Sequence, residues 1–329
     1  MSFFAVLFAL LIEQVKPLPR DNPVHHLLVS WVAWTGRHFD AGKPRHAWVV
    51  WGVGVVGPSL LVCAVWWWVR QYTLIGALVL NVVMLYLTLG FRQFSHFFTD
   101  IREALTRGDE IEARRLLAEW RHLDASELPR TELLRHVIEH SLLAAHRHVF
   151  GVFFWFVVLA ALGLGPLGAV FYRMAEFASR YWGYRQRALD APSNEGLLAV
   201  ARLAFNWIDH VPARLTAFGF AVVGNFEEAV AGWRRDAALW RHANEGIILA
   251  AAAGAVGVQL GGTAAPGVTP DRSKTFASGV ETDHASAEGS TPGVAPQLGH
   301  LQSVVALVWR SVVLWLLLLA LLSLANVIG

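Results

Sequence analysis

The stretch VVALVWRSVVLWLLLLALLSLANVI, residues 304–328, decides the fold of this chain. It contains a single charged side chain, Arg310. A helix of this length rises about 38 Å, enough to cross the roughly 30 Å hydrocarbon core of a bilayer. Helices of soluble proteins usually keep a polar face over such a length, and this stretch has none. It therefore predicts a membrane-spanning helix.

The composition of the whole chain favours a lipid bilayer as its surroundings. Hydrophobic residues make up 55% and charged residues 16% of the sequence, whereas soluble domains are about 25% charged. Tryptophan and arginine gather at the ends of apolar runs, as in WWWVR at 66–70, where interfacial anchors are expected. The sequence predicts an all-α, polytopic membrane protein.

Two classes are excluded by what the composition lacks. Cys63 is the single cysteine, so an internal disulfide framework cannot form. The arginines are spread between apolar runs, not gathered on a soluble basic domain, so no nucleic acid partner is expected. The N-terminal run has no basic leader and no cleavage motif, which predicts a retained membrane helix.

Apolar runs divide the chain. They lie at about 2–15, 47–69, 74–90, 149–171, 246–262 and 304–328, with a weaker one near 211–224. Residues 70–73 are too short a connection for anything but an antiparallel hairpin. The flanking polar segments 16–46 and 91–148 must then share one face of the membrane. Both are rich in arginine, and the positive-inside rule places them in the cytoplasm.

Three segments have a predicted architecture of their own. Residues 91–148 form a cytoplasmic helical insert whose helices break at Gly108-Asp109. The run 149–171 is interrupted by G-L-G-P at 163–166, which predicts a re-entrant pair of short helices. Residues 263–303 are rich in Gly, Pro, Ser and Thr, which predicts a flexible linker. This linker is expected in the periplasm, with 246–262 crossing the membrane outward before it and 304–328 crossing back after it.

Ionisable residues inside apolar surroundings are the candidates for chemistry, because burying them in a membrane is costly. Glu176 and Asp209 are two of these, and pairing with Arg173 or Arg214 is the structural alternative. A second group surrounds Glu139 and contains His136, His140, His146 and His148. That group could hold a metal, but no H-E-x-x-H signature is present. Its alternative is an interfacial helix whose histidines face water or headgroups.

Short motifs over residues 1–262 occur in the order and spacing of a known family. They are W-R-R-D-A at 233–237, A-N-E-G at 243–246, G-A-V-G-V-Q-L-G-G at 254–262, V-P-A-R-L-T at 211–216, F-Y-R at 171–173, G-Y-R at 183–185 and N-P-V at 22–24. On these residues the chain resembles the CobD/CbiB family of cobalamin biosynthesis. The terminal span matches that family in kind.

The resemblance implies a multi-pass protein of the bacterial inner membrane. Enzymes of the family join adenosylcobyric acid to aminopropanol or its phosphate in an ATP-dependent, amide-forming step. Such a step needs cationic groups for anionic substrates and carboxylates that hold Mg²⁺ against phosphates. Residues implied to bind a corrinoid or a phosphorylated small molecule are Arg173, Arg185, Arg214, Arg235 and Asn244. Carboxylates implied in catalysis are Glu139, Glu176, Asp209 and Asp236.

The acidic pattern of the family is incomplete here. Residues that stand where the family has acids are Leu143, Arg147, Ser179, Phe205 and Asn206. These losses favour a protein that keeps the fold and binds a ligand without synthase activity. The glycine-rich signature at 254–262 favours the enzyme, and both hypotheses stay open. Mg²⁺ and ATP enter as cofactors only if the chain is an active synthase.

A sister group, AmpE, is similar at two of the places where the enzyme pattern fails, Arg147 and Asp209. AmpE proteins are membrane sensors or signalling modulators linked to β-lactamase induction. The alternative function is therefore a non-enzymatic sensor. Whether the chain forms a homo-oligomer stays open as well.

Overall fold

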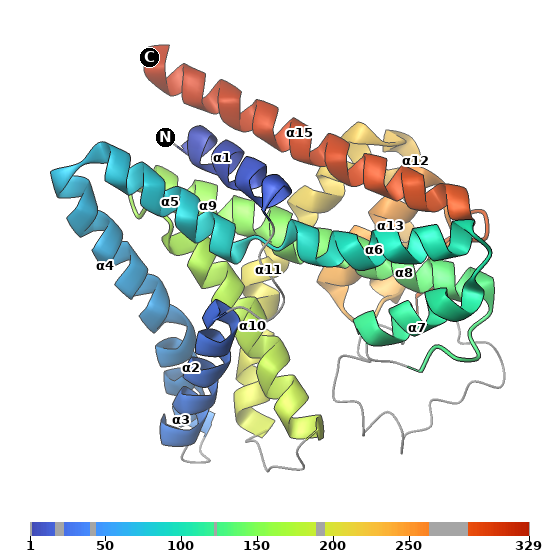
Figure 1. The fold of residues 1–329 in the computed structure, drawn as a ribbon, viewed down its shortest axis with the longest axis horizontal. Helices are drawn as coiled ribbons and strands as arrows, with labels where there is room; N and C mark the ends of the chain where they lie inside the picture. The colour runs from blue at the N-terminus through green and yellow to red at the C-terminus, as the bar shows by residue number, and fades with distance from the viewer. Residues whose placement is uncertain are drawn as a thin grey trace. The chain divides into compact units, whose positions relative to one another are not determined.

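The computed structural model describes residues 2–16, 23–39, 44–121, 124–188, 195–262 and 289–328, and this part of the chain is almost entirely helical (Figure 1). The helices form two compact units. Unit 1 comprises Met1–Gln93, Arg147–Asp209 and Trp315–Gly329. Unit 2 comprises Phe94–His146 and His210–Leu314. The predicted all-α, polytopic class is confirmed.

Unit 1 contains the N-terminal helices, a central helix pair and the end of the last helix. In chain order these are α1 (Ser2–Val15), α2 (Pro23–Phe39), α3 (Pro44–Trp51), the π-helical turn η1 (Gly52–Val56), α4 (Gly57–Tyr72), α5 (Leu74–Thr88), α9 (Gly151–Ala161), α10 (Leu167–Ala188), the first part of α11 (Glu195–Val223) and the last turns of α15 (Leu298–Ile328).

The core of unit 1 is organised by α10. Its buried residues Val170, Met174, Ala178 and Trp182 recur every four positions, and residues at this spacing lie on one face of a helix. This face packs against buried residues of α2, α3, η1 and α11. The packing fixes the polar residues that α10 carries between these positions.

Unit 2 contains the predicted insert and most of the family signature. Its elements are α6 (Phe91–Thr106), α7 (Glu110–Arg121), α8 (Arg130–Ala145), the π-helical turn η2 that begins at His146 and ends at Phe150, the second part of α11, α12 (Phe226–Asp236), the 3₁₀ turn η3 (Ala237–Leu239), α13 (Ala243–Val256) and the first turns of α15. Gly108, with φ of 80°, separates α6 from α7, so the break predicted there is confirmed.

The helices α12 and α13 pack closely because small residues line their contact. A Cβ atom at Gly232 would lie 2.8 Å from the carbonyl oxygen of Ala250. At Gly254 it would overlap the backbone of Glu228 and Ala229. Small residues allow two helix backbones to approach in this way. The alanine- and glycine-rich sequence of α13 is therefore a packing requirement.

Among the residues that the structure describes, three helices are long and apolar enough to cross a bilayer. They are Arg45–Tyr72, Arg130–Ala161 and Leu298–Ala325, and the shorter apolar helices are Ser2–Val15, Leu74–Thr88 and Ala243–Val256. The second of the long helices is continuous through α8, η2 and α9. The apolar run predicted to begin at 149 is thus the second half of a longer helix. The first half of that helix belongs to the predicted insert 91–148.

The break predicted at 163–166 is present. α9 ends at Ala161, α10 begins at Leu167, and the backbone between them turns at Gly163 (φ 80°) and Gly165 (φ 57°). Two helices replace one straight span over 149–171, as the sequence predicts. Whether this pair is re-entrant stays a prediction.

The helix predicted to cross the membrane over 246–262 is shorter than predicted. α13 has 14 residues and rises about 21 Å, less than the roughly 30 Å of the hydrocarbon core. Gly257 ends it in the left-handed conformation, with its N–H bonded to the carbonyl of Ala253 at 2.8 Å. The periplasmic location of residues 263–303 stays a prediction, and α13 alone is too short a helix to support it.

The predicted linker 263–303 is shorter than expected at its C-terminal end. Residues 263–288 lie outside the described part of the chain. Residues 289–294 pair with 258–262, through Gln259 N–H to Val294 O at 2.9 Å and Thr291 N–H to Leu260 O at 2.9 Å. α15 begins at Leu298, six positions before the predicted start.

Candidate functional site

The carboxylate of Glu139 holds the glycine-rich signature in place. The backbone N–H of Gly261 donates to Glu139 Oε1 at 2.8 Å, and Arg135 Nη1 donates to Gly261 O at 2.8 Å. Arg135 Nε also lies 3.8 Å from Glu139 Oε1, and the same guanidinium pairs with Glu132. Both Arg135 and Glu139 are buried. One i, i+4 pair on α8 thus clamps both backbone groups of a single glycine.

Gly261 itself explains why the signature contains glycine. Its φ is 72°, a conformation that L side chains rarely adopt. A Cβ atom there would overlap the backbone of Gly289 and lie 3.1 Å from the ring of Trp240. The signature at 254–262 is therefore needed for helix packing and a tight turn. These are structural reasons that do not depend on catalysis.

The histidines around Glu139 have separate partners in unit 2. Arg121 Nη1 donates to His136 Nδ1 at 3.0 Å. Because arginine is only a donor, that nitrogen carries no proton. The ring of His140 packs edge-on against Trp120, with centroids 4.5 Å apart. His146 Nδ1 lies 2.9 Å from Thr216 Oγ1.

This arrangement contradicts the water-facing alternative for two of the histidines. The side chains of His136 and His146 are 7% and 1% exposed. Nor do the histidines gather: among the described residues, no group of three or more His, Cys, Asp or Glu side chains is placed to hold a metal ion. The separate partners therefore give no support to the metal-site hypothesis.

Arg214 and Asn244 meet at the N-terminus of α13. Arg214 Nη1 lies 3.4 Å from Asn244 Oδ1 and donates to the carbonyl of His210 at 2.8 Å. Asn244 is buried and Arg214 is partly exposed. His242, the N-cap residue, gives the first turn no side-chain cap. A helix N-terminus beside a guanidinium attracts anions, and the first turn also carries the carboxylate of Glu245.

Asp236 and Arg235 form a bidentate pair at the end of α12. Arg235 Nε and Nη2 donate to the two carboxylate oxygens, each at 2.8 Å. Asp236 is buried, whereas 55% of the Arg235 side chain is exposed. Paired side chains of this kind are held in one geometry. Both carboxylate oxygens of Asp236 therefore already accept hydrogen bonds from the adjacent Arg235.

The other two predicted carboxylates lie in unit 1. Tyr172 donates its hydroxyl to Asp209 Oδ1 at 2.8 Å. Burial, and next the negative charge of Asp209, raises the pKa of Tyr172 well above its usual range. Glu176 pairs with Arg173 Nη1 at 2.8 Å and with Arg180 Nε at 2.5 Å. The predicted alternative of a Glu176–Arg173 pair is confirmed.

One predicted site residue, Arg185, and one family motif cannot be joined to these contacts. The side chain of Arg185 lies outside the described residues, as does most of the N-P-V motif at 22–24. The remaining candidates divide between the units, with Glu139, Asp236, Arg214, Arg235 and Asn244 in unit 2 and Glu176, Asp209 and Arg173 in unit 1.

Sequence analysis missed Arg121, Arg135 and the role of Tyr172. The i, i+4 spacing of Arg135 and Glu139 was the available signal for one of them. The contact of Arg121 with His136 had no such signal, because α7 and α8 are separate helices.

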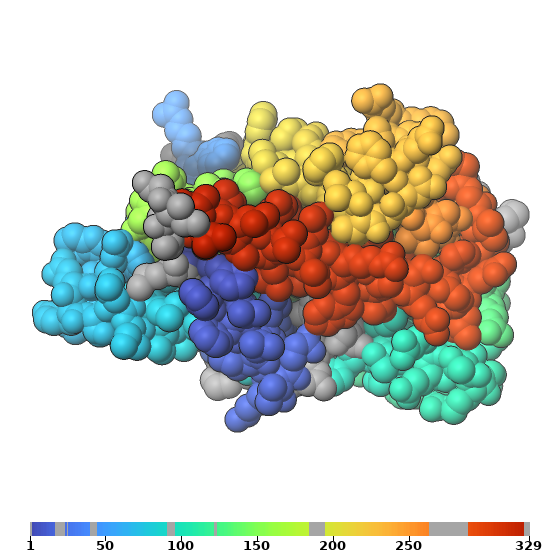
Figure 2. Space-filling view, turned by 90° about the horizontal axis from the view of Figure 1, so that it is seen from above, coloured from blue at the N-terminus to red at the C-terminus, as the bar shows by residue number. Residues whose placement is uncertain are grey.

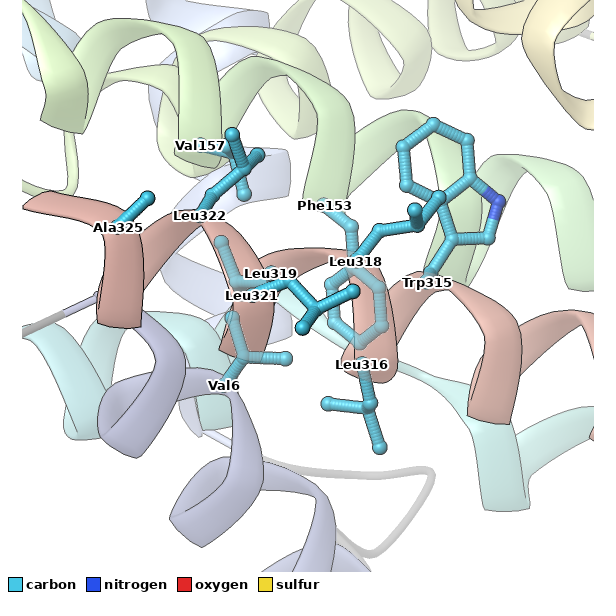
Figure 3. A pocket seen from close by; sticks show the side chains of 10 residues that line it. All are labelled: Val6, Phe153, Val157, Trp315, Leu316, Leu318, Leu319, Leu321, Leu322 and Ala325. Carbon is cyan, nitrogen blue, oxygen red and sulfur yellow. The ribbon is translucent and has the colours of Figure 1, made fainter.

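An apolar cavity of unit 1 contains no group that could carry out a reaction. It encloses about 470 Å³ between α1, α9 and the end of α15 (Figure 3). Its lining is hydrocarbon apart from the indole of Trp315. Without a titratable or nucleophilic group, such a cavity cannot be a reaction site.

The residues present do not fit a centre of Mg²⁺ and ATP within either unit. Magnesium prefers carboxylate oxygens and phosphate oxygens. Each of the four predicted carboxylates instead accepts a hydrogen bond from an arginine, a tyrosine or a backbone amide of its own unit. A metal ion would compete with these donors for the carboxylate oxygens that they engage.

Comparison with known proteins agrees with the motifs. A family model described as CobD/Cbib protein matches residues 4–286. The chain is 32% identical over 324 residues to the cobalamin biosynthesis protein CobD of Stutzerimonas stutzeri, which covers 96% of each chain. It is 35% identical over 191 residues, 57% of each chain, to the protein of the same name from Chromobacterium violaceum. No solved structure matches.

The AmpE alternative is not favoured by these relatives, since both carry cobalamin biosynthesis names. The family model spans both structural units, and the first relative aligns over nearly the whole chain. The chain belongs to the CobD/CbiB family of cobalamin biosynthesis proteins.

Proposed function

We propose that this protein binds a corrinoid at the bacterial inner membrane as part of cobalamin biosynthesis, and that it lacks synthase activity of its own. The relatives support the pathway. The corner formed by Arg214, Asn244 and the N-terminus of α13 supports the binding of an anionic group of the ligand. The polar segments 16–46 and 91–148 of the protein face the cytoplasm.

One observation supports the absence of synthase activity. Glu139, the acid that survives from the family's acidic run, is engaged by Arg135 and the N–H of Gly261. Its Oε1 atom stabilises the glycine turn, which gives this carboxylate a structural role that does not depend on a metal ion. At three further positions where the family has acids, the chain has Leu143, Arg147 and Ser179, which provide no carboxylate.

Binding can be measured directly with the full chain in detergent. We expect the purified protein to bind cobyric acid in equilibrium dialysis, followed by corrin absorbance. Arg214→Gln should weaken this binding by about tenfold or more, because a charge-assisted hydrogen bond is lost. Arg107→Gln changes an exposed arginine of the same unit, between α6 and α7, and should have little effect. Equal affinity of the Arg214→Gln variant and the wild type would contradict the proposed site.

Complementation tests the absence of synthase activity separately. A strain that lacks adenosylcobinamide-phosphate synthase should not regain cobalamin-dependent growth when it expresses this chain, whereas restoring its own gene should rescue it. Immunoblotting of the membrane fraction establishes that the chain is present. Growth rescue by the wild-type chain would show that it is a synthase, and corrinoid binding would then serve catalysis.

A further inference from the structure

Arg310 marks the depth at which α15 enters the hydrocarbon. Residues 311–328 contain no charged side chain, and these 18 residues rise about 27 Å, close to the roughly 30 Å core of a bilayer. Trp309, an aromatic of the kind found at membrane interfaces, precedes Arg310. The turns of α15 from Leu298 to Arg310 therefore lie at the level of the headgroups and beyond. α15, in red, is open on the face seen in Figure 2.

A cavity of about 390 Å³ adjoins this part of α15 in unit 2. Gln302, Ala306 and Arg310 line it from one side and lie four residues apart, on one face of the helix. Gly224 and Ala255 line it from the other side. The cavity exists because three of these positions are glycine or alanine.

The charge of Arg310 is available inside this cavity. Among the residues that the structure describes, no carboxylate pairs with Arg310, and its side chain is exposed. The backbone carbonyls at the end of α13 are already used. Ala255 O accepts the N–H of Asn225 at 3.2 Å, and Ala253 O accepts those of Gly257 and Val258. At the level of the headgroups, an unpaired guanidinium has lipid phosphates within reach as its counter-ions.

We propose that this cavity binds a phosphate group, with the phosphodiester of an anionic phospholipid as its source. Arg310 supplies a planar set of donors that matches phosphate oxygens. The amide of Gln302 adds a neutral donor, whereas the hydroxyl of Ser303, which also lines the cavity, already donates to the carbonyl of Gly299 at 3.4 Å. No acidic side chain lines the cavity, and one positive charge balances the single negative charge of a phosphodiester. The site is independent of the corrinoid site.

The test uses the full chain in nanodiscs of phosphatidylcholine. Phosphatidylglycerol is titrated in, and bound lipid is counted by native mass spectrometry. Arg310→Gln should lower the apparent affinity for phosphatidylglycerol by about tenfold or more, whereas Arg310→Lys should keep part of it. Ala306→Leu fills the cavity without changing charge and should cause a similar loss.

Two matched variants separate the site from general surface effects. Arg70→Gln removes another arginine at the end of a span, where it lies over the ring of Trp66. It should lower affinity by at most about fivefold, the effect of one surface cation. Ala320→Leu adds the same volume to α15 outside the cavity and should not change binding. If Arg310→Gln loses no more affinity than Arg70→Gln, the proposal is wrong.

A second arm identifies the source of the phosphate. Inorganic phosphate at millimolar concentration is titrated against the protein in phosphatidylcholine nanodiscs, with thermal stabilisation as the readout. Stabilisation that depends on Arg310 would support a phosphate site for a soluble ligand in place of a lipid. Binding of neither probe by the folded wild-type protein would overturn the site altogether.

Discussion

At the scale of single residues, the buried acids of this protein accept hydrogen bonds that hold the fold together. Glu139 accepts the N–H of a glycine 122 positions later in the chain. Asp209 accepts the hydroxyl of Tyr172, and Glu176 accepts two arginines. A buried charge persists only when donors of this kind compensate for its lost hydration. These pairings therefore explain why ionisable residues occur in so apolar a chain.

Removal of the Glu139 carboxylate should destabilise unit 2. Glu139→Ala leaves the buried N–H of Gly261 without its acceptor, while Arg135 keeps Glu132, and the loss of such a hydrogen bond costs about 1–3 kcal/mol. Glu139→Gln keeps an oxygen for the Gly261 N–H and should cost less. Thermal or denaturant unfolding in detergent measures both.

The control for this change is Glu119→Ala. Glu119 belongs to an exposed pair with Arg115, and exposed pairs contribute under about 1 kcal/mol. Equal effects of Glu119→Ala and Glu139→Ala on the unfolding free energy would contradict the clamp between α8 and the glycine turn.

At the scale of elements, glycine decides where helices end and how closely they pack. Gly257 ends α13, and Gly163 and Gly165 separate α9 from α10, in each case with a positive φ. Gly254 lies inside α13 and has no such conformational reason. Its reason is the approach of α12, whose backbone fills the space of a side chain.

Gly254→Leu should therefore cost about 3 kcal/mol in the unfolding free energy, because overpacking forces the two helices apart. Gly299→Leu is the matched change, since a Cβ atom at Gly299 in α15 meets nothing within 4 Å. That variant should be neutral or more stable, because leucine favours a helix over glycine by up to about 1 kcal/mol. A stable Gly254→Leu protein would refute the close packing.

At the scale of the whole molecule, the outstanding question is orientation in the membrane. We expect the insert 91–148 to face the cytoplasm, on the basis of its arginines. Ser126, in the exposed turn between α7 and α8, is a suitable reporter. The protein has one natural cysteine, Cys63, and Cys63→Ser supplies the background for the variant Ser126→Cys.

A membrane-impermeant maleimide should label this variant in inverted membrane vesicles and leave it unlabelled in intact spheroplasts. Detergent-solubilised protein establishes that the site reacts at all. Labelling in spheroplasts would place the insert outside the cell and reverse the predicted topology of the chain.

The sequence by itself determined the helical class, the apolar segments, the breaks at Gly108 and at 163–166, and the family. These follow from local properties: hydropathy along a helix, glycine in a turn, and short motifs in a fixed order. Only the tertiary structure decided which residues pair. Glu139 with Gly261 and Arg121 with His136 join separate elements, and no local pattern encodes such contacts. It also decided that α13 is too short to span a bilayer, because one left-handed glycine ends the helix although apolar residues continue beyond it.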